Sequence, residues 1–276
     1  MATSPSSSKR RPTVIYPTSD GKPVAETPTH RDNLLGLIDV LRAHYADDPT
    51  IYVSGNMFVY YVEGDKRRHV SPDVFLVRGI DDRERRRDAY FVWEEARGPE
   101  LVVEFTSKST RKEDIEDKLA LYRETLGVLE YFLFDPFEEY LKPSMQGFRR
   151  VGDEFEPIEG RRGRLPSEVT GMHMERSGWE LRVHNPATGR WLPTRDERAE
   201  AAERHAQAAK ERAEIAEQRA ELERQRAELE RRHAETMDQV AREAIRQAEF
   251  ERLRWAGERA ELLREVKALR EGRGGE

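Results

Sequence analysis

Two carboxylates occupy positions at which the sequence predicts strands. Glu104 follows the apolar run 101–103 in "PELVVEFTSKST", and this run is typical of a buried strand. Asp73 follows Pro72 in "HVSPDVFLV", at the beginning of another predicted strand. An unpaired buried carboxylate is costly, so Glu104 is expected to have a cationic partner. Two acids that converge at one end of neighbouring strands form an oxygen-rich site suited to Mg²⁺ or Mn²⁺.

Other polar residues could complete such a metal site. Glu26, just before the first predicted helix, could supply a third carboxylate. Lys118 lies on a later predicted helix, and Asp114 and Tyr122 stand four residues to either side of it, on the same helix face. A lysine beside a metal can stabilise charge on a phosphate or orient an attacking water.

Each of these residues also has an ordinary structural interpretation. Asp73 could cap a turn after Pro72, and Glu104 could form a buried salt bridge with an arginine. Lys118 and Tyr122 could belong to an ordinary helix surface. The histidines show no metal-ligand spacing, and the sequence contains no glycine-rich phosphate loop and no Gly-x-Ser-x-Gly elbow. A zinc enzyme is therefore not expected.

Apolar spacing predicts the elements that position these residues. The first helix begins with Thr29 as N-cap and has Asp32 three residues later, as in a capping box. Its apolar positions recur at helical spacing: Leu34, Leu37, Ile38, Leu41 and Tyr45. Strands are predicted over residues 51–53, 57–62, 73–77, 101–105 and 129–135. A second helix over residues 112–126 separates the last two strands and ends at Gly127. With hairpins and loops over residues 137–192, these elements predict a small α/β domain.

Composition narrows the class of protein. The chain is 37% charged, its mean hydropathy is −0.87 and its net charge is −6. It has no 18-residue apolar run and no secretory signal, so a soluble protein without a membrane span is expected. The absence of cysteine excludes disulfides and thiol nucleophiles, and it fits a reducing, cytoplasmic compartment. Nucleic acid would have to be bound locally, because the net charge is negative.

The region after Pro193 differs from the rest of the chain. It contains no proline, and "AEIAEQRAELERQRAELERR" predicts a long charged helix. Ile215, Leu222 and Leu229 recur every seven residues, but the positions four residues further on are Arg219, Arg226 and His233. Only half of a coiled-coil seam is therefore present, although Leu262, Val266 and Leu269 restore a narrow apolar stripe. A solvated single helix and a weak oligomerising coil both remain open, the second making the chain a possible homo-oligomer.

Clusters of arginines on predicted loops could bind phosphates. Residues 81–90, "DDRERRRDAY", contain Arg85, Arg86 and Arg87 on a loop between the two acid-bearing strands. Similar clusters occur at 149–150 and 161–164. Each cluster could equally be a solvated loop, because acids are mixed with the arginines. No recognised base-reading motif is visible, so no sequence preference is predicted.

The combination "SPD", "VEFTSKST" and "GVLEYFLFDP" resembles the Uma-two family of endonucleases, in the PD-(D/E)XK nuclease superfamily. The resemblance covers about residues 19–194 and implies a restriction-endonuclease-like core, a mixed sheet flanked by helices. It implies that Asp73 and Glu104 hold the metal. The lysine usual two residues after the glutamate is replaced by Thr106. The resemblance suggests that Lys118 has taken its place, with Lys108 as the alternative.

These observations together predict an Mg²⁺- or Mn²⁺-dependent endonuclease that hydrolyses phosphodiester bonds, expected to be those of DNA, with a metal-activated water. Its domains are expected to be a disordered lead (1–18), a nuclease-like domain (19–194) and a charged helical or coiled-coil tail (195–276). The alternative is a non-catalytic nuclease-like scaffold with a coiled-coil interaction tail, because Thr106 stands where the lysine is expected.

Overall fold

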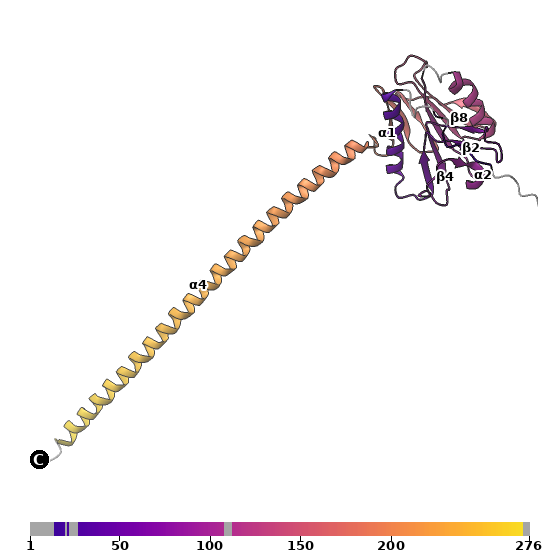
Figure 1. The fold of residues 1–276 in the computed structure, drawn as a ribbon. Helices are drawn as coiled ribbons and strands as arrows, with labels where there is room; N and C mark the ends of the chain where they lie inside the picture. The colour runs from indigo at the N-terminus through magenta and orange to yellow at the C-terminus, as the bar shows by residue number, and fades with distance from the viewer. Residues whose placement is uncertain (1–13, 20, 22–26, 108–111, 273–276) are drawn as a thin grey trace, which may run out of the picture. The chain divides into compact units, whose positions relative to one another are not determined.

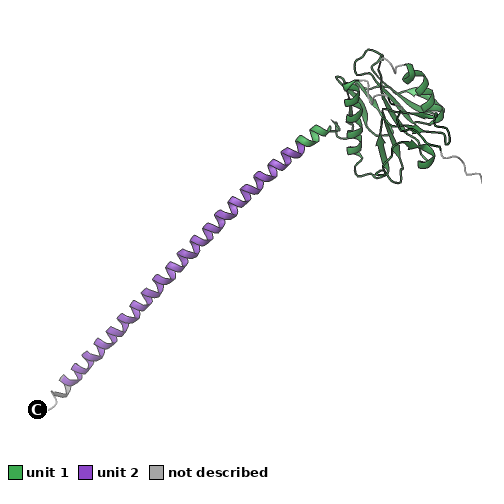
Figure 2. Ribbon diagram, viewed as in Figure 1, with its two compact units in different colours: residues 1–200 green, residues 201–276 purple. Residues whose placement is uncertain are grey.

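The structure is a computed structural model that describes residues 14–19, 21, 27–107 and 112–272. The chain divides into two compact units, residues 1–200 and 201–276 (Figure 2). We refer to residues 1–200 as the body. No helix in the described ranges has the length and apolarity needed to cross a bilayer.

A six-stranded mixed sheet forms the centre of the body. Its strand order is β1-β4-β6-β7-β8-β9, with β6 and β7 parallel and the other neighbouring pairs antiparallel. The strands are β1 Ile51–Ser54, β4 Val74–Arg78, β6 Leu101–Phe105, β7 Glu130–Phe134, β8 Met145–Val151 and β9 Glu154–Pro157. Helical turns join the parallel pair, so the predicted strand–helix–strand unit and the mixed α/β fold are confirmed.

Two smaller sheets complete the body. One is an antiparallel sheet in the region where the sequence predicts hairpins, with β10 Arg164–Pro166, β11 His173–Ser177, β12 Glu180–Asn185 and β13 Arg190–Trp191 in that order. The other has the order β3-β2-β5, with β2 Val59–Tyr60, β3 His69–Val70 and β5 Tyr90–Phe91. The strand predicted over residues 57–62 is therefore shorter than expected.

The helices of the body are α1 Pro28–His44, α2 Val92–Glu95 and a segment between β6 and β7. This segment consists of a π-helical turn η1 Glu113–Asp117, a short α-helix α3 Lys118–Ala120 and a second π-helical turn η2 Leu121–Thr125. The sequence predicts a helix here, but apolar spacing alone does not distinguish π turns from α turns.

Helix α1 begins two residues earlier than predicted. Its N-cap is Thr27, whose Oγ1 accepts a hydrogen bond from the N–H of His30 at 3.1 Å, so the prediction of Thr29 as N-cap is wrong. Pro28 occupies the first turn, where its missing N–H would have had no helical partner.

The central sheet is buried on both faces. Helix α1 covers one face (Figure 1), where Leu34 and Leu41 pack with Val103. On the other face, Tyr122 from the π-helical segment packs with Val102. Because successive residues of a strand point to opposite faces, β6 contributes to both clusters.

Part of the predicted disordered lead lies in the described ranges. The hydroxyl of Tyr16 accepts a hydrogen bond from the N–H of Gly64 at 2.6 Å, and its ring packs against Tyr60, Phe91 and Trp93. Residues 1–13 lie outside the described residues.

The predicted tail forms one helix, α4 Arg195–Gly272. Its first residues, 195–200, belong to the body, where Arg198 lies 2.5 Å from Asp39. Ile215, Leu222 and Leu229 are 51%, 49% and 70% exposed, respectively. The long helix is therefore confirmed, and its association into a coil stays a prediction.

Candidate active site

Asp73 and Glu104 lie side by side at one end of the central sheet. β4 and β6 pair with Val74 opposite Val103, and the two acids are the next residues along this register. The N–H of Asp73 donates to Glu104 Oε2 at 3.3 Å. In return, the N–H of Phe105 donates to Asp73 Oδ2 at 2.8 Å. The antiparallel register therefore brings together the two acids that the sequence singles out.

Glu104 has both a cation and a hydroxyl as partners. Its side chain is on the same face of β6 as Val102, toward the π-helical segment, and only 1% of the residue is exposed. Its Oε1 accepts a hydrogen bond from the hydroxyl of Tyr122 at 2.6 Å. Its Oε2 lies 3.1 Å from Lys118 Nζ. The burial of the carboxylate is therefore compensated by a lysine, and not by the arginine considered as an alternative.

Lys118 contacts a second buried carboxylate. Asp114, four residues earlier, is fully buried, and its Oδ1 lies 3.0 Å from Lys118 Nζ. The backbone carbonyl of Asp114 accepts a hydrogen bond from the hydroxyl of Tyr131 on β7 at 3.0 Å, which fixes the helical segment to the sheet. The segment contains π turns, which are rare and occur often at functional sites. The sequence places Asp114 on the lysine's face but does not predict its burial.

His30 is a site residue that sequence reasoning missed. Its Nε2 lies 3.1 Å from Asp73 Oδ1, and its side chain is 11% exposed. His30 belongs to the first turn of α1 and is four residues before Leu34. The sequence does contain a signal for the burial of this histidine. The spacing of one buried helix face includes His30, Leu34, Leu37 and Leu41. A histidine on that face is expected to meet the sheet.

Burial and neighbouring charges shift the ionisation of the site. Burial raises the pKa of Glu104 well above its usual range; the Lys118 ammonium opposes this shift, and the carboxylates of Asp73 and Asp114 add to it. Burial by itself would lower the pKa of Lys118, but Glu104 and Asp114 outweigh this effect and raise it above the usual range. Lys118 therefore remains an ammonium ion at neutral pH. Burial also raises the pKa of Tyr122, which keeps its hydroxyl a hydrogen-bond donor.

Two predicted residues cannot be placed relative to this site. Glu26, the predicted third carboxylate, and Lys108, the alternative lysine, both lie outside the described residues. Across residues 27–107 and 112–272, no group of three or more histidine, aspartate or glutamate side chains is arranged to hold one metal ion. Of the three acids predicted to hold the metal, Asp73 and Glu104 are the two that lie within the described residues.

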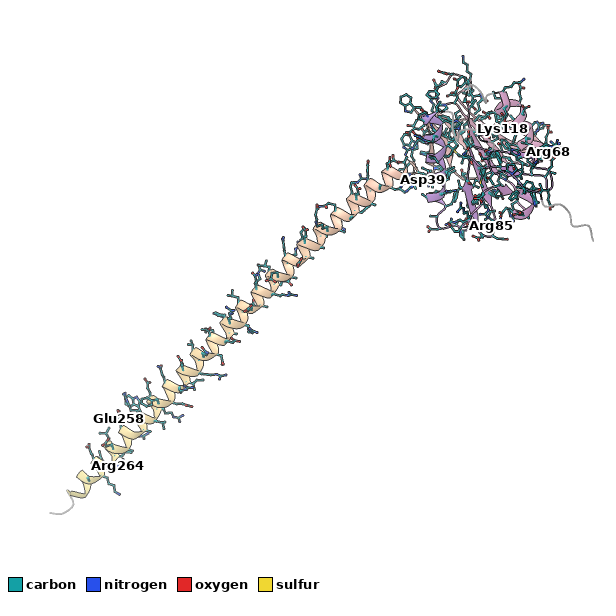
Figure 3. The ribbon with its side chains drawn as sticks, in the orientation of Figure 1. Asp39, Arg68, Arg85, Lys118, Glu258 and Arg264 are labelled. Carbon is teal, nitrogen blue, oxygen red and sulfur yellow. The ribbon has the colours of Figure 1, made fainter. Side chains whose placement is uncertain are left out.

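Arginines of the 81–90 loop form ion pairs with other residues of the body. Arg87 is 3% exposed in its side chain, pairs with Glu95 at 2.8 Å and lies over the ring of Tyr52. Arg85 also pairs with Glu95, whereas the side chain of Arg86 is 92% exposed. Lys118 and Arg85 lie well apart on the body in Figure 3. A role for this loop in binding nucleic acid stays a prediction, and Arg86 is the member best placed for it.

A glycine lets the turn between β1 and β2 approach Asp73 closely. A Cβ atom at Gly55 would overlap the backbone carbonyl oxygen of Asp73. The N–H of Asn56 donates to the carbonyl of Pro72 at 2.8 Å, which holds the turn in this position. The backbone at Asp73 is therefore supported from the side opposite β6.

Replacing Gly55 by alanine should weaken this support. We expect Gly55→Ala to lower the free energy of unfolding by ~1–3 kcal/mol, the usual cost of overpacking. Urea titration followed by circular dichroism measures this change. Gly36→Ala is the matched control, because a Cβ there meets no atom within 4 Å and alanine favours the helix. Equal stability of the Gly55 variant and the unsubstituted protein would contradict the close approach.

A family model matches more than half of the chain. The model of a family named Uma2, with the description "Putative restriction endonuclease", matches residues 6–183. Among solved structures, a "putative nuclease belonging to DUF820" from Anabaena variabilis matches at 14% identity. That match covers 54% of this chain and 78% of the other, with a TM-score of 0.40. No curated protein matches the sequence.

Proposed function

Because the chain belongs to the Uma2 family, we propose that it is a metal-dependent endonuclease that hydrolyses phosphodiester bonds of DNA. The observation that supports this proposal best is that Glu104 contacts both Asp73 and Lys118 at one end of the central sheet. Two adjacent carboxylates and a charged lysine are the groups needed to bind a divalent cation and a phosphate together.

The charges of the site fit a divalent cation. The carboxylates of Asp73, Glu104 and Asp114 gather around a single ammonium group, that of Lys118. When all are ionised, the cluster has an excess of negative charge, which is costly in a buried site. Mg²⁺ binds through one or two protein carboxylates and retains several waters, so Asp73 and Glu104 suffice without a third ligand.

A bound Mg²⁺ or Mn²⁺ would act as a Lewis acid on the phosphate and make water a better nucleophile. The residues of the chain would do the rest. Asp73 and Glu104 would hold the cation, and the N–H groups of Phe105 and Asp73 keep their carboxylates in position. Lys118 would donate hydrogen bonds to a phosphate oxygen or to the attacking water, and it stays charged while doing so. Tyr122 fixes the rotamer of Glu104.

The position of Lys118 bears on the alternative function, a non-catalytic scaffold. Thr106 replaces the usual strand lysine, which by itself suggests a degenerate site. Lys118 reaches Glu104 from the helical segment instead, at 3.1 Å. A lysine therefore contacts the acid proposed to bind the metal although the strand lysine is missing, and we favour the enzyme.

A cleavage assay tests the proposed function. The full chain should cut plasmid or single-stranded DNA when Mg²⁺ or Mn²⁺ is added and not when EDTA is present. Glu104→Gln should be inactive, while Glu116→Gln, which changes an exposed acid of the helical segment that carries Lys118, should stay active. No cleavage of either DNA with either ion would favour the scaffold.

A further inference from the structure

The C-terminal half of α4 exposes an apolar face. Trp255, Leu262 and Val266 are 65%, 61% and 46% exposed, and Ile245 is 60% exposed. Several large apolar side chains exposed together are uncommon on proteins that act alone. Side chains project from the helix along its whole length in Figure 3, which labels Glu258 and Arg264.

These residues follow a heptad repeat. One column, seven residues apart, is entirely non-polar: Ala241, Ala248, Trp255 and Leu262. A second column, four residues after each member of the first, consists of Ile245, Arg252, Arg259 and Val266. We call these two columns the tail stripe. They correspond to the d and a positions of a coiled coil, respectively.

The charges beside the tail stripe indicate the orientation of a partner helix. Glu251, Glu258 and Glu265 each immediately precede a residue of the second column, which makes them g positions. In a parallel pair, an a-position side chain packs beside the g position of the other helix. Arg252 and Arg259 would therefore meet glutamates. In an antiparallel pair the g positions face one another, and the three glutamates would repel.

We propose that the tail stripe is covered by a second copy of this chain, in a parallel two-stranded coiled coil. The self-complementary charges favour a second copy over another protein, because both halves of each Arg–Glu pair come from the same sequence. The two arginines weaken the core but specify the register, as polar a-position residues do.

The tail stripe is a different helix face from the one that carries Ile215, Leu222 and Leu229. Those residues lie two positions after Ala213, Ala220 and Ala227, which continue the non-polar column of the tail stripe upstream. They therefore occupy outer f positions of the proposed coil and provide a control. In a parallel pair both chains enter the coil at the same end, each after its own body. One dimer therefore carries two candidate active sites.

Sedimentation equilibrium of the full chain tests the association. We expect a mass twice the 32.1 kDa of one chain at micromolar concentration. The double variant Trp255→Glu, Leu262→Glu should weaken the dimer at least ~100-fold, because it removes two large apolar side chains from each copy. The double variant Leu222→Glu, Leu229→Glu should leave it unchanged. A monomer, or equal effects of the two double variants, would overturn the proposal.

Disulfide cross-linking tests the orientation, and the chain contains no native cysteine to interfere. In a parallel pair in register, Ala248 faces Ala248 of the partner subunit, so Ala248→Cys should form a covalent dimer under mild oxidation. Glu243→Cys, on the outer face, should cross-link much less. Similar cross-linking of both variants would exclude the parallel register, and an assembly larger than a dimer would exclude the two-stranded coil.

Discussion

Replacing Glu104 by glutamine is expected to abolish specific binding of Mn²⁺ while the protein stays folded. The substitution preserves the size of the side chain but removes one of two adjacent carboxylates. We expect the affinity to fall at least ~100-fold, equivalent to ~2.7 kcal/mol of binding free energy. Asp73→Asn should have an effect of similar size. Isothermal titration of the full chain with Mn²⁺ measures both.

The control for this experiment is another carboxylate close in sequence. Glu116 lies on the same helical segment as Lys118, but its side chain is 63% exposed and pairs with Lys112 at 4.0 Å. Glu116→Gln should therefore bind Mn²⁺ as the unsubstituted protein does. Binding of Mn²⁺ by the Glu104 and Asp73 variants with unchanged affinity would show that the cation is held elsewhere.

The pH dependence of unfolding without metal tests the ionisation of Glu104 separately from metal binding. Burial raises the pKa of Glu104 above its value in an unfolded chain, so the folded state binds a proton more readily. Ionised Glu104 therefore lowers stability as the pH rises through the interval above its unfolded pKa. Glutamine removes this dependence, and unfolding of Glu104→Gln should vary less with pH than unfolding of the unsubstituted protein.

The strands that carry the two acids could be predicted because the sequence patterns that define these strands are local. The apolar run before Glu104 defines β6 and its end, and both β6 and its bounds agree with the predicted strand. The sequence predicts that the two acids converge at one end of neighbouring strands. The antiparallel register that sets Asp73 beside Glu104 joins residues 31 positions apart and is seen only in the structure.

The remaining contacts depend on how distant segments pack. His30 meets Asp73 only because α1 lies across the sheet, and a pattern within one helix does not identify that partner. The burial of Arg87 similarly depends on Glu95 and Tyr52, which its own loop does not reveal. Asp114 is buried because π turns and Tyr131 hold its segment against β7. Local charge made the arginine loop resemble a phosphate-binding surface, whereas tertiary contacts use three of its four arginines, Arg83, Arg85 and Arg87.

Replacing Lys118 by methionine should separate catalysis from metal binding. Methionine has a similar length but no charge, so the variant loses the ammonium group 3.1 Å from Glu104 and 3.0 Å from Asp114. We expect turnover to fall ~10²–10³-fold, the usual cost of removing one group that stabilises charge in the transition state. The affinity for Mn²⁺ should stay the same or rise, because Lys118 no longer competes with the cation for Glu104.

Two further lysines determine how this result is interpreted. Lys112→Met is the matched control, because the Lys112 side chain is 84% exposed on the same segment, and its turnover should be unchanged. Lys108 is closer in sequence to Glu104, and Lys108→Met should have little effect if Lys118 has replaced the usual strand lysine. An inactive Lys108 variant beside an active Lys118 variant would assign the catalytic lysine to position 108. The Glu104–Lys118 contact would then be a buried salt bridge, whose loss would lower stability and leave turnover unchanged.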